Sequence, residues 1–205
     1  MPGVNVAVIV GSNRRDSINR KLAQALVRLA DSQLAASFVQ IDDLPMYNQD
    51  LESPLPASVA RFKASVEHAA ALLIVSPEHN RSVPAVLKNA IDWGTRPYGH
   101  NSWAGKGVAI VGTSPGAIGT AIAQQHLRNV LGNLGALVMG GEAYVMFKPG
   151  LIDEAETVTD AGTRRFLQSF ASMSLQDSLP ALSRRRTQLQ LDPILLRSPS
   201  CPYVR

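Results

Sequence analysis

The sequence predicts an α/β protein with a doubly wound, five-stranded parallel sheet and helices on both faces. Short apolar segments rich in β-branched residues alternate along the chain with segments whose apolar residues recur at helical spacing, which is typical of βαβ units. Apolar residues make up 45% of the 205 residues and aromatic residues only 5%, so Val, Ile, Leu and Ala must build the core. The length suits one large domain better than two.

The expected strands are short apolar runs that end at turn residues. The run at 4–10 ends at Gly11-Ser12, and the run at 71–75 is stopped by Ser76-Pro77. The other three strands are expected at 37–41, 108–112 and 136–139. Helices are expected at 18–30, 59–69, 83–93, 117–131 and 161–175.

Residues 1–178 are expected to form this single domain, and 179–205 a basic, proline-containing C-terminal tail. Beyond Ser178 the periodic pattern dissolves into prolines and a run of consecutive arginines, which is typical of a flexible segment. The alternative is that the apolar residues at 194–196 dock the tail on a neighbouring subunit.

Composition and charge exclude several function classes. The formal net charge is +4, but much of the excess comes from arginines near the C-terminus, namely Arg184, Arg185, Arg186, Arg197 and Arg205. A phosphorylated small molecule therefore explains the remaining placed arginines better than a nucleic acid does. No apolar run reaches the length of a membrane span and no signal-peptide pattern opens the chain, so we expect a cytoplasmic protein without membrane contact.

The cysteine and histidine content argues against a metal site. The single cysteine, Cys201, excludes an intrachain disulfide and a cysteine-based metal site. None of the four histidines has the i, i+4 partner of a helical zinc site, so we expect no metal.

The loop after the first strand is suited to a phosphate group. In an open parallel sheet, the ligand binds beyond the carboxyl ends of the strands, where the strand order reverses. This loop leads into a helix N-terminus, whose free N–H groups and dipole favour an anion. It offers the Ser12 and Ser17 hydroxyls, the Arg14 guanidinium and the Asn19 amide. Alternatively, Ser17 only caps the helix, and the two roles are compatible.

Two common nucleotide motifs are missing from the chain. It has neither the Gly-Lys-Ser/Thr ending of a Walker loop nor a G-x-G-x-x-G fingerprint. Asp42 and Asp43 follow the second strand in the position of a ribose-binding acid, but without the glycines they do not indicate a dinucleotide fold.

The loop after the third strand contains Pro77 and Pro84, which restrict their own backbone angles and those of the preceding residues. We expect a stiff, extended loop that presents backbone groups to the edge of a planar heterocycle, rather than a plain connector. Glu78 has two interpretations, a general base or an anchor that fastens this loop, and the anchor is favoured.

Three ordered motifs resemble the NADPH-dependent FMN reductases of the flavodoxin-like superfamily, which include bacterial chromate and quinone reductases. The first is G-S-x-R-x-x-S-x-N at residues 11–19. The second is the family's P-E-Y-N followed by S-x-P and L-K-N-A-I-D-W, matched at 77–93 except at position 79. The third is a Ser/Gly loop and a helix that ends in H-L-R, found at 113–128. The resemblance covers residues 4–175.

The resemblance implies a flavodoxin-like fold with strand order 2-1-3-4-5, bound FMN, and NADPH or NADH as co-substrate. The implied FMN-binding residues are Ser12, Arg14, Ser17, Ile18, Asn19, Pro77, Glu78, His79, Asn80, Ser114 and Gly116. They place the FMN phosphate on the first loop. One edge of the isoalloxazine ring lies against the second loop, and the opposite edge of the ring against the third. No catalytic acid or base is expected. The resemblance also implies a homodimer or homotetramer.

The sequence departs from the family pattern at two positions. His79 stands where the family has a tyrosine, so an aromatic neighbour of the ring becomes a titratable one. Gly119-Thr120 replaces a glycine pair, which narrows the approach to the flavin there.

We therefore expect an oxidoreductase that passes electrons from NAD(P)H through FMN, by a ping-pong mechanism, to quinones, free flavins, azo compounds or chromate. The first rival is a flavodoxin-type carrier that binds FMN without oxidising NAD(P)H. Carriers usually expose acidic surfaces and flank the flavin with aromatic side chains. This chain has no acidic excess, and its loop from Pro77 to Pro84 has no Phe, Tyr or Trp. The second rival is a binding or regulatory protein that has lost the flavin.

Overall fold

The computed structural model describes residues 4–30 and 34–176. Its centre is a parallel sheet in the order β2-β1-β3-β4-β5, made by Leu34–Val39 (β2), Val4–Val10 (β1), Ala71–Val75 (β3), Gly107–Ser114 (β4) and Leu137–Val138 (β5). A further strand, Tyr144–Met146 (β6), pairs with the second half of β4. The predicted flavodoxin-like strand order is confirmed.

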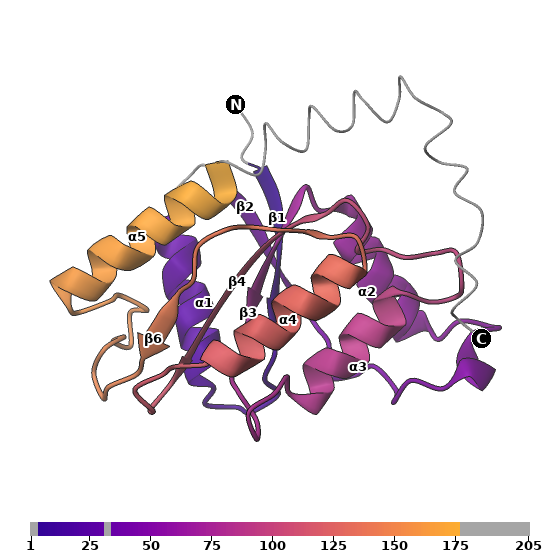
Figure 1. The fold of residues 1–205 in the computed structure, drawn as a ribbon, viewed down its shortest axis with the longest axis horizontal. Helices are drawn as coiled ribbons and strands as arrows, with labels where there is room; N and C mark the ends of the chain where they lie inside the picture. The colour runs from indigo at the N-terminus through magenta and orange to yellow at the C-terminus, as the bar shows by residue number, and fades with distance from the viewer. Residues whose placement is uncertain (1–3, 31–33, 177–205) are drawn as a thin grey trace.

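Helices cover both faces of the sheet (Figure 1). One face packs against α1 (Ile18–Leu29) and α5 (Ala161–Gln176), and the other against α2 (Ala57–His68), α3 (Ala85–Gly94) and α4 (Ala121–Asn133). A short 3₁₀ helix, Gln49–Leu51, lies between β2 and α2. Because β1 and β3 are covered on both faces, they are apolar along their buried length instead of alternating with polar residues.

Local signals explain where the helices begin. Pro84 has extended backbone angles, so α3 starts at Ala85 and not at the predicted residue 83. The expected start of α4 at residue 117 is also too early. Gly119 has a left-handed φ of +58°, which no helix contains, and α4 begins only after it.

The edge of the sheet differs from the prediction of one strand at 136–139. Only the two residues of β5 pair with β4 there, and the chain then leaves the sheet and returns as β6. Arg128 of α4 donates hydrogen bonds to the carbonyls of Met139 and Gly141, which hold the connecting segment against the helix. Two short strands therefore share β4 as their partner.

Two expectations concern the ends and the environment of the chain. The predicted domain boundary at 178 and the tail 179–205 lie outside the described residues. Within the part of the chain that the structure describes, no helix is both long enough and apolar enough to cross a membrane.

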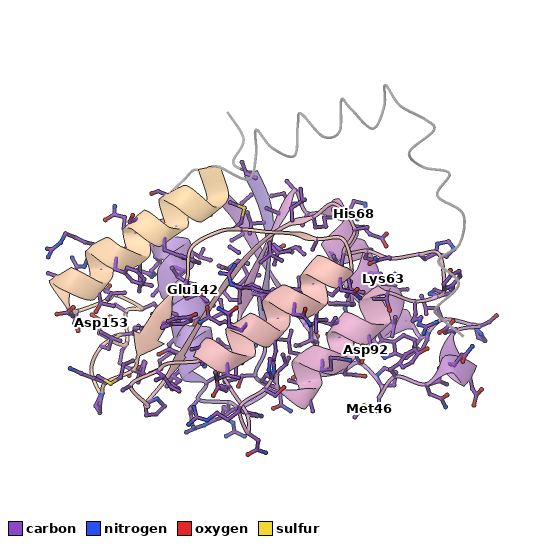
Figure 2. All side chains as sticks on the ribbon, viewed as in Figure 1. Met46, Lys63, His68, Asp92, Glu142 and Asp153 are labelled. Carbon is purple, nitrogen blue, oxygen red and sulfur yellow. The ribbon has the colours of Figure 1, made fainter. Side chains whose placement is uncertain are left out.

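A buried lysine ties α2 to the segment that follows α3 (Figure 2). Lys63 is 7% exposed, and its Nζ atom donates to Gly94 O (3.3 Å), His100 O (2.6 Å) and Ser102 Oγ (2.7 Å). Burial lowers the pKa of Lys63 from its ordinary value of 10.5, and the Glu67 carboxylate, 3.8 Å away, partly opposes that shift.

Candidate functional site

Loops from three strands meet at the carboxyl end of the sheet, where the strand order reverses between β1 and β3. Val10, Val75 and Val111 lie side by side in β1, β3 and β4. The loops after β1 and β3 leave the sheet at this level, while β4 continues to Ser114 beside β6. This switch point is where open α/β sheets bind their ligands.

Close backbone packing at this level requires a glycine in β4. A Cβ atom at Gly112 would lie 2.1 Å from Ser76 O and 2.2 Å from Thr120 Oγ1. Both distances are far below van der Waals contact, so a side chain at 112 would displace the second loop. Glycine there lets that loop lie directly against β4.

The first loop ends at the N-terminus of α1 and offers several groups to an anion. The Ser17 hydroxyl caps the helix by accepting a hydrogen bond of 3.3 Å from a backbone N–H of its first turn. The Ser12 hydroxyl accepts from Arg14 N at 3.4 Å, and the Arg14 side chain is exposed. The N–H groups of Ile18 and Asn19 lie in the first turn, where the helix itself provides no acceptor.

The Asn19 side chain is already bound to the protein. It is 2% exposed, its Oδ1 accepts from Thr113 N, and its Nδ2 donates to Thr113 O, both at 2.9 Å. These bonds fix the start of α1 against β4. The amide to which the sequence pointed is therefore occupied, and the group of Asn19 without a helix acceptor is its backbone N–H.

The second loop contains a tight turn at 79–82. His79 N donates to Ser82 O at 3.1 Å, and Ser82 N donates to His79 O at 2.9 Å. Asn80 and Arg81 have φ values of 49° and 62°, the combination found in type I′ turns. Asparagine tolerates this left-handed backbone better than arginine does. The turn is a fixed structure that presents the exposed His79 and Asn80 side chains at the edge of the site.

Glu78 fastens the second loop to α4. Its Oε2 accepts from Ile122 N and Ala123 N, both at 3.0 Å, and its Oε1 lies 3.3 Å from Arg81 Nη1. The residue before α4, Thr120, makes no capping bond with its side chain. The Glu78 carboxylate therefore satisfies free N–H groups of the helix and places a negative charge at its positive end. With its side chain only 8% exposed, Glu78 is an anchor and is not placed as a general base.

Replacement of Glu78 by alanine is expected to lower the free energy of unfolding by about 1–2 kcal/mol, because two helix N–H groups lose their cap. Chemical denaturation of the purified protein measures the loss. Glu154→Ala is the matched control, since that side chain is 99% exposed and pairs with Lys21 only at 3.6 Å. Its expected effect is within about 0.5 kcal/mol, and equal losses for the two variants would contradict the anchoring role.

The third loop closes on itself at the end of β4. The Ser114 hydroxyl donates to Gly119 O at 2.7 Å and accepts from Gly116 N at 3.2 Å. No atom outside the loop comes within 4 Å of a Cβ built at Gly116, so the loop is open to the solvent on that side. Ser114 and Gly116 are thus positioned together, as the motif predicted.

β6 forms the outer wall beside this loop, and sequence reasoning missed it. Phe147 N donates to Ser114 O at 2.8 Å, and Thr113 Oγ1 donates to Val145 O at 2.7 Å. The sequence signal for β6 is the alternation of exposed Tyr144, buried Val145 and exposed Met146. Three residues are too few for such a pattern to be distinguished from a loop.

The three loops form one connected unit with groups suited to FMN. Asn19 joins the first loop to β4, and Glu78 joins the second to α4, helped by a 3.0 Å contact between Ser82 Oγ and His126 Nδ1. Free N–H groups, a hydroxyl and the exposed Arg14 fit a phosphate at the first loop, while the second and third loops fit the edges of a flat ring. Among the described residues, no three His, Cys, Asp or Glu side chains gather as a metal site.

Comparison with known proteins agrees with this arrangement. The family model described as NADPH-dependent FMN reductase matches residues 4–149. The chain is 49% identical over 168 residues to 2-hydroxy-1,4-benzoquinone reductase from a Burkholderia species, covering 82% of this chain and 92% of that protein. It is 48% identical over 168 residues to a quinone reductase from Pseudomonas putida, and the match covers 81% of this chain and 90% of that protein.

Among solved structures, the chain is similar to the flavoenzyme NAD(P)H:(acceptor) oxidoreductase from Paracoccus denitrificans. The TM-score is 0.82 at 45% sequence identity, and the match covers 88% of this chain and 98% of that one. The resemblance drawn from three sequence motifs is confirmed. The chain belongs to the NADPH-dependent FMN reductase family and is an oxidoreductase with FMN as cofactor and NAD(P)H as co-substrate.

Proposed function

We propose that this protein reduces quinones with NAD(P)H, and that donor and acceptor bind in turn at one open face of the FMN site. The observation that carries the proposal is the convergence of the α1 N-terminus, the turn at 79–82 and the loop at 114–119 on the switch point of the sheet. The two relatives are both named as quinone reductases, which supports quinones as the acceptor class.

The proposed contacts follow the three loops. We assign the FMN phosphate to the Ser12 and Ser17 hydroxyls, the Arg14 guanidinium, and the N–H groups of Ile18 and Asn19. The ring is assigned to the second loop, Pro77, Glu78, His79 and Asn80, of which Glu78 acts by holding the loop in place. Ser114 and Gly116 are assigned to its other edge.

When bound, FMN supplies a two-electron carrier between NAD(P)H and the acceptor. The protein's part is to bind and orient. Glu78 and Asn19 hold the loops rigid without contacting a reacting atom, and the backbone N–H groups of the loops stabilise negative charge at the ring edge. No side chain of the site is required as a catalytic acid or base.

Steady-state kinetics test the shared face. With NADPH and 1,4-benzoquinone both varied, we expect parallel double-reciprocal lines, because the oxidised donor leaves before the quinone enters. Intersecting lines would require both substrates to be bound together and would contradict the proposal. A yellow protein that does not consume NADPH would instead be a flavodoxin-type carrier. A colourless protein would be neither an FMN reductase nor a carrier.

The same open face admits free flavins, azo compounds and chromate, and ranking their kcat/KM values against that of benzoquinone tests the choice of acceptor. We further propose a cytoplasmic homodimer or homotetramer with no nucleic-acid or membrane partner. Ile118 and Ile122, which are 50% and 39% exposed beside the third loop, support a subunit contact near the site. Analytical ultracentrifugation measures the oligomeric state.

A further inference from the structure

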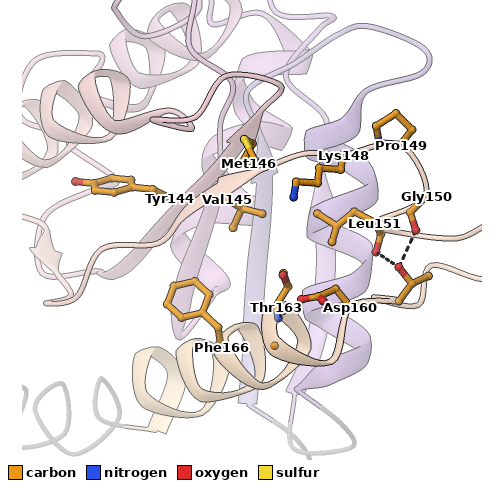
Figure 3. A pocket seen from close by; sticks show the side chains of 12 residues that line it. Tyr144, Val145, Met146, Lys148, Pro149, Gly150, Leu151, Asp160, Thr163 and Phe166 are labelled. Atoms are coloured by element: carbon orange, nitrogen blue, oxygen red, sulfur yellow. Dashed lines mark hydrogen bonds between the residues drawn. The ribbon is translucent and has the colours of Figure 1, made fainter.

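A second cavity lies between β6 and the start of α5, beside the FMN site but outside its three loops (Figure 3). Its volume is about 560 Å³, within the range of small-molecule sites. Met146 in its wall is paired in register with Ser114, the first residue of the third loop. The cavity therefore adjoins the edge assigned to the flavin ring.

The walls of this cavity suit a flat ring. Tyr144 of β6 and Phe166 of α5 both line the cavity. In Figure 3 the Phe166 ring points from α5 toward β6, and the Tyr144 ring extends on the side of β6 away from Lys148. Tyr144 and Phe166 are 37% and 45% exposed, and Met146 is 38% exposed. Aromatic and thioether groups stack favourably on flat heterocycles, and here the described chain leaves each of them partly exposed.

Lys148 is an exposed cation in the cavity wall. It directs its ammonium group into the space between β6 and α5 (Figure 3), and within 4–30 and 34–176 no hydrogen bond or ion pair joins it to the protein, although its charge acts on the Asp160 carboxylate of the same wall. Asp160 is engaged at the N-terminus of α5, where its Oδ1 accepts from Thr163 N at 2.7 Å. Thr159 Oγ1 donates to Gly150 O at 2.7 Å.

We propose that this cavity binds the adenosine-phosphate end of NAD(P)H, with the adenine ring beside Tyr144 and Phe166 and a phosphate at Lys148. The inference rests on the proposed function, which requires a nicotinamide nucleotide at the adjoining FMN site. A flat heterocycle joined to a phosphate matches two aromatic side chains of the wall and one ammonium group that makes no hydrogen bond within the described residues. The nicotinamide end then extends past Met146 toward the third loop.

The test compares two hydride donors that differ only in this end. Reduced nicotinamide mononucleotide lacks the adenosine phosphate, so it does not use the cavity. In the FMN-loaded protein, Lys148→Ala and Phe166→Ala are each expected to raise KM for NADPH about tenfold, the usual scale for loss of one charge-assisted or stacking contact, and to leave KM for the mononucleotide unchanged. Arg165→Ala, which removes an exposed cation of α5 outside the cavity wall, is expected to change neither value.

Calorimetric titration of 5′-AMP into the FMN-loaded protein gives a readout that does not depend on turnover. Wild type is expected to bind AMP, and Lys148→Ala about tenfold more weakly. Equal changes in KM for both donors, or no change for either, would overturn the inference. So would a change in sedimentation of Lys148→Ala with an unaltered ratio of KM values, because the cavity would then be a subunit contact. A wild type that binds AMP but oxidises neither donor would refute the proposed function and leave the cavity assignment standing.

Discussion

Replacing Arg14 with alanine is expected to weaken FMN binding about tenfold to a hundredfold and to leave riboflavin binding unchanged. Arg14 is exposed in the loop that leads to the N-terminus of α1, and the same loop carries the Ser12 and Ser17 hydroxyls. A charge-assisted contact of about 1.5–3 kcal/mol to the phosphate is lost in the variant, and riboflavin has no phosphate to lose. Fluorescence titration of both flavins into the apoprotein measures the two affinities.

The neighbouring Arg15 provides a matched control. It is exposed in the same loop and carries the same charge, but the motif assigns it no contact with FMN. Arg15→Ala is expected to change FMN affinity by no more than about threefold, the long-range effect of one screened charge. Equal losses of FMN and riboflavin in Arg14→Ala, or a larger FMN loss in Arg15→Ala, would reject the phosphate assignment.

Replacement of Lys63 by methionine is expected to lower the free energy of unfolding by about 1–3 kcal/mol. Methionine fills a similar space but removes the donor from His100 O, whereas Gly94 O still accepts from Ser102 N and Ser102 Oγ still donates to Glu67 Oε1. A buried polar group left without a partner costs about 1–3 kcal/mol, and the His100 carbonyl is left so here. Urea denaturation at saturating FMN measures the loss.

The control for this variant is Lys88→Met on α3. Lys88 is 49% exposed and pairs with Asp92 at 2.7 Å in an i, i+4 arrangement. Because exposed pairs of this kind contribute about 0.3–0.5 kcal/mol, the expected loss is small. Comparable destabilisation by the two variants would mean that the buried hydrogen bonds of Lys63 contribute no more to the free energy of unfolding than an exposed ion pair does.

The free energy of unfolding is also expected to depend on pH through Lys63. Burial lowers its pKa in the folded state below 10.5, so the unfolded chain holds this proton more tightly than the folded one. The contribution of Lys63 to the free energy of unfolding therefore rises with pH between the lowered pKa and 10.5. The rise is expected in wild type and absent in Lys63→Met, and parallel pH profiles for the two proteins would contradict it.

Short-range patterns were sufficient for the general fold. The runs at 4–10 and 71–75 are apolar without alternation because both faces of these strands are covered. A continuous apolar run can be recognised from neighbouring residues alone. The start of α1 is equally local, since Ser17 caps the helix that follows it directly. The family motifs extended this prediction to the strand order and the cofactor.

Contacts between residues distant in sequence were decided only by the tertiary structure. Asn19 was predicted as a phosphate ligand from its place in the motif, but its amide is bound to Thr113, 94 positions away. Glu78 caps a helix that begins more than 40 residues later, and no spacing rule connects the two. The strand β6 exists because β5 pairs only with Gly107 and Val108, which leaves the same edge of β4 free from Gly112 to Ser114. Composition and periodicity report which face of an element is buried, whereas the partner of a buried polar group depends on which distant backbone the fold brings within hydrogen-bond distance.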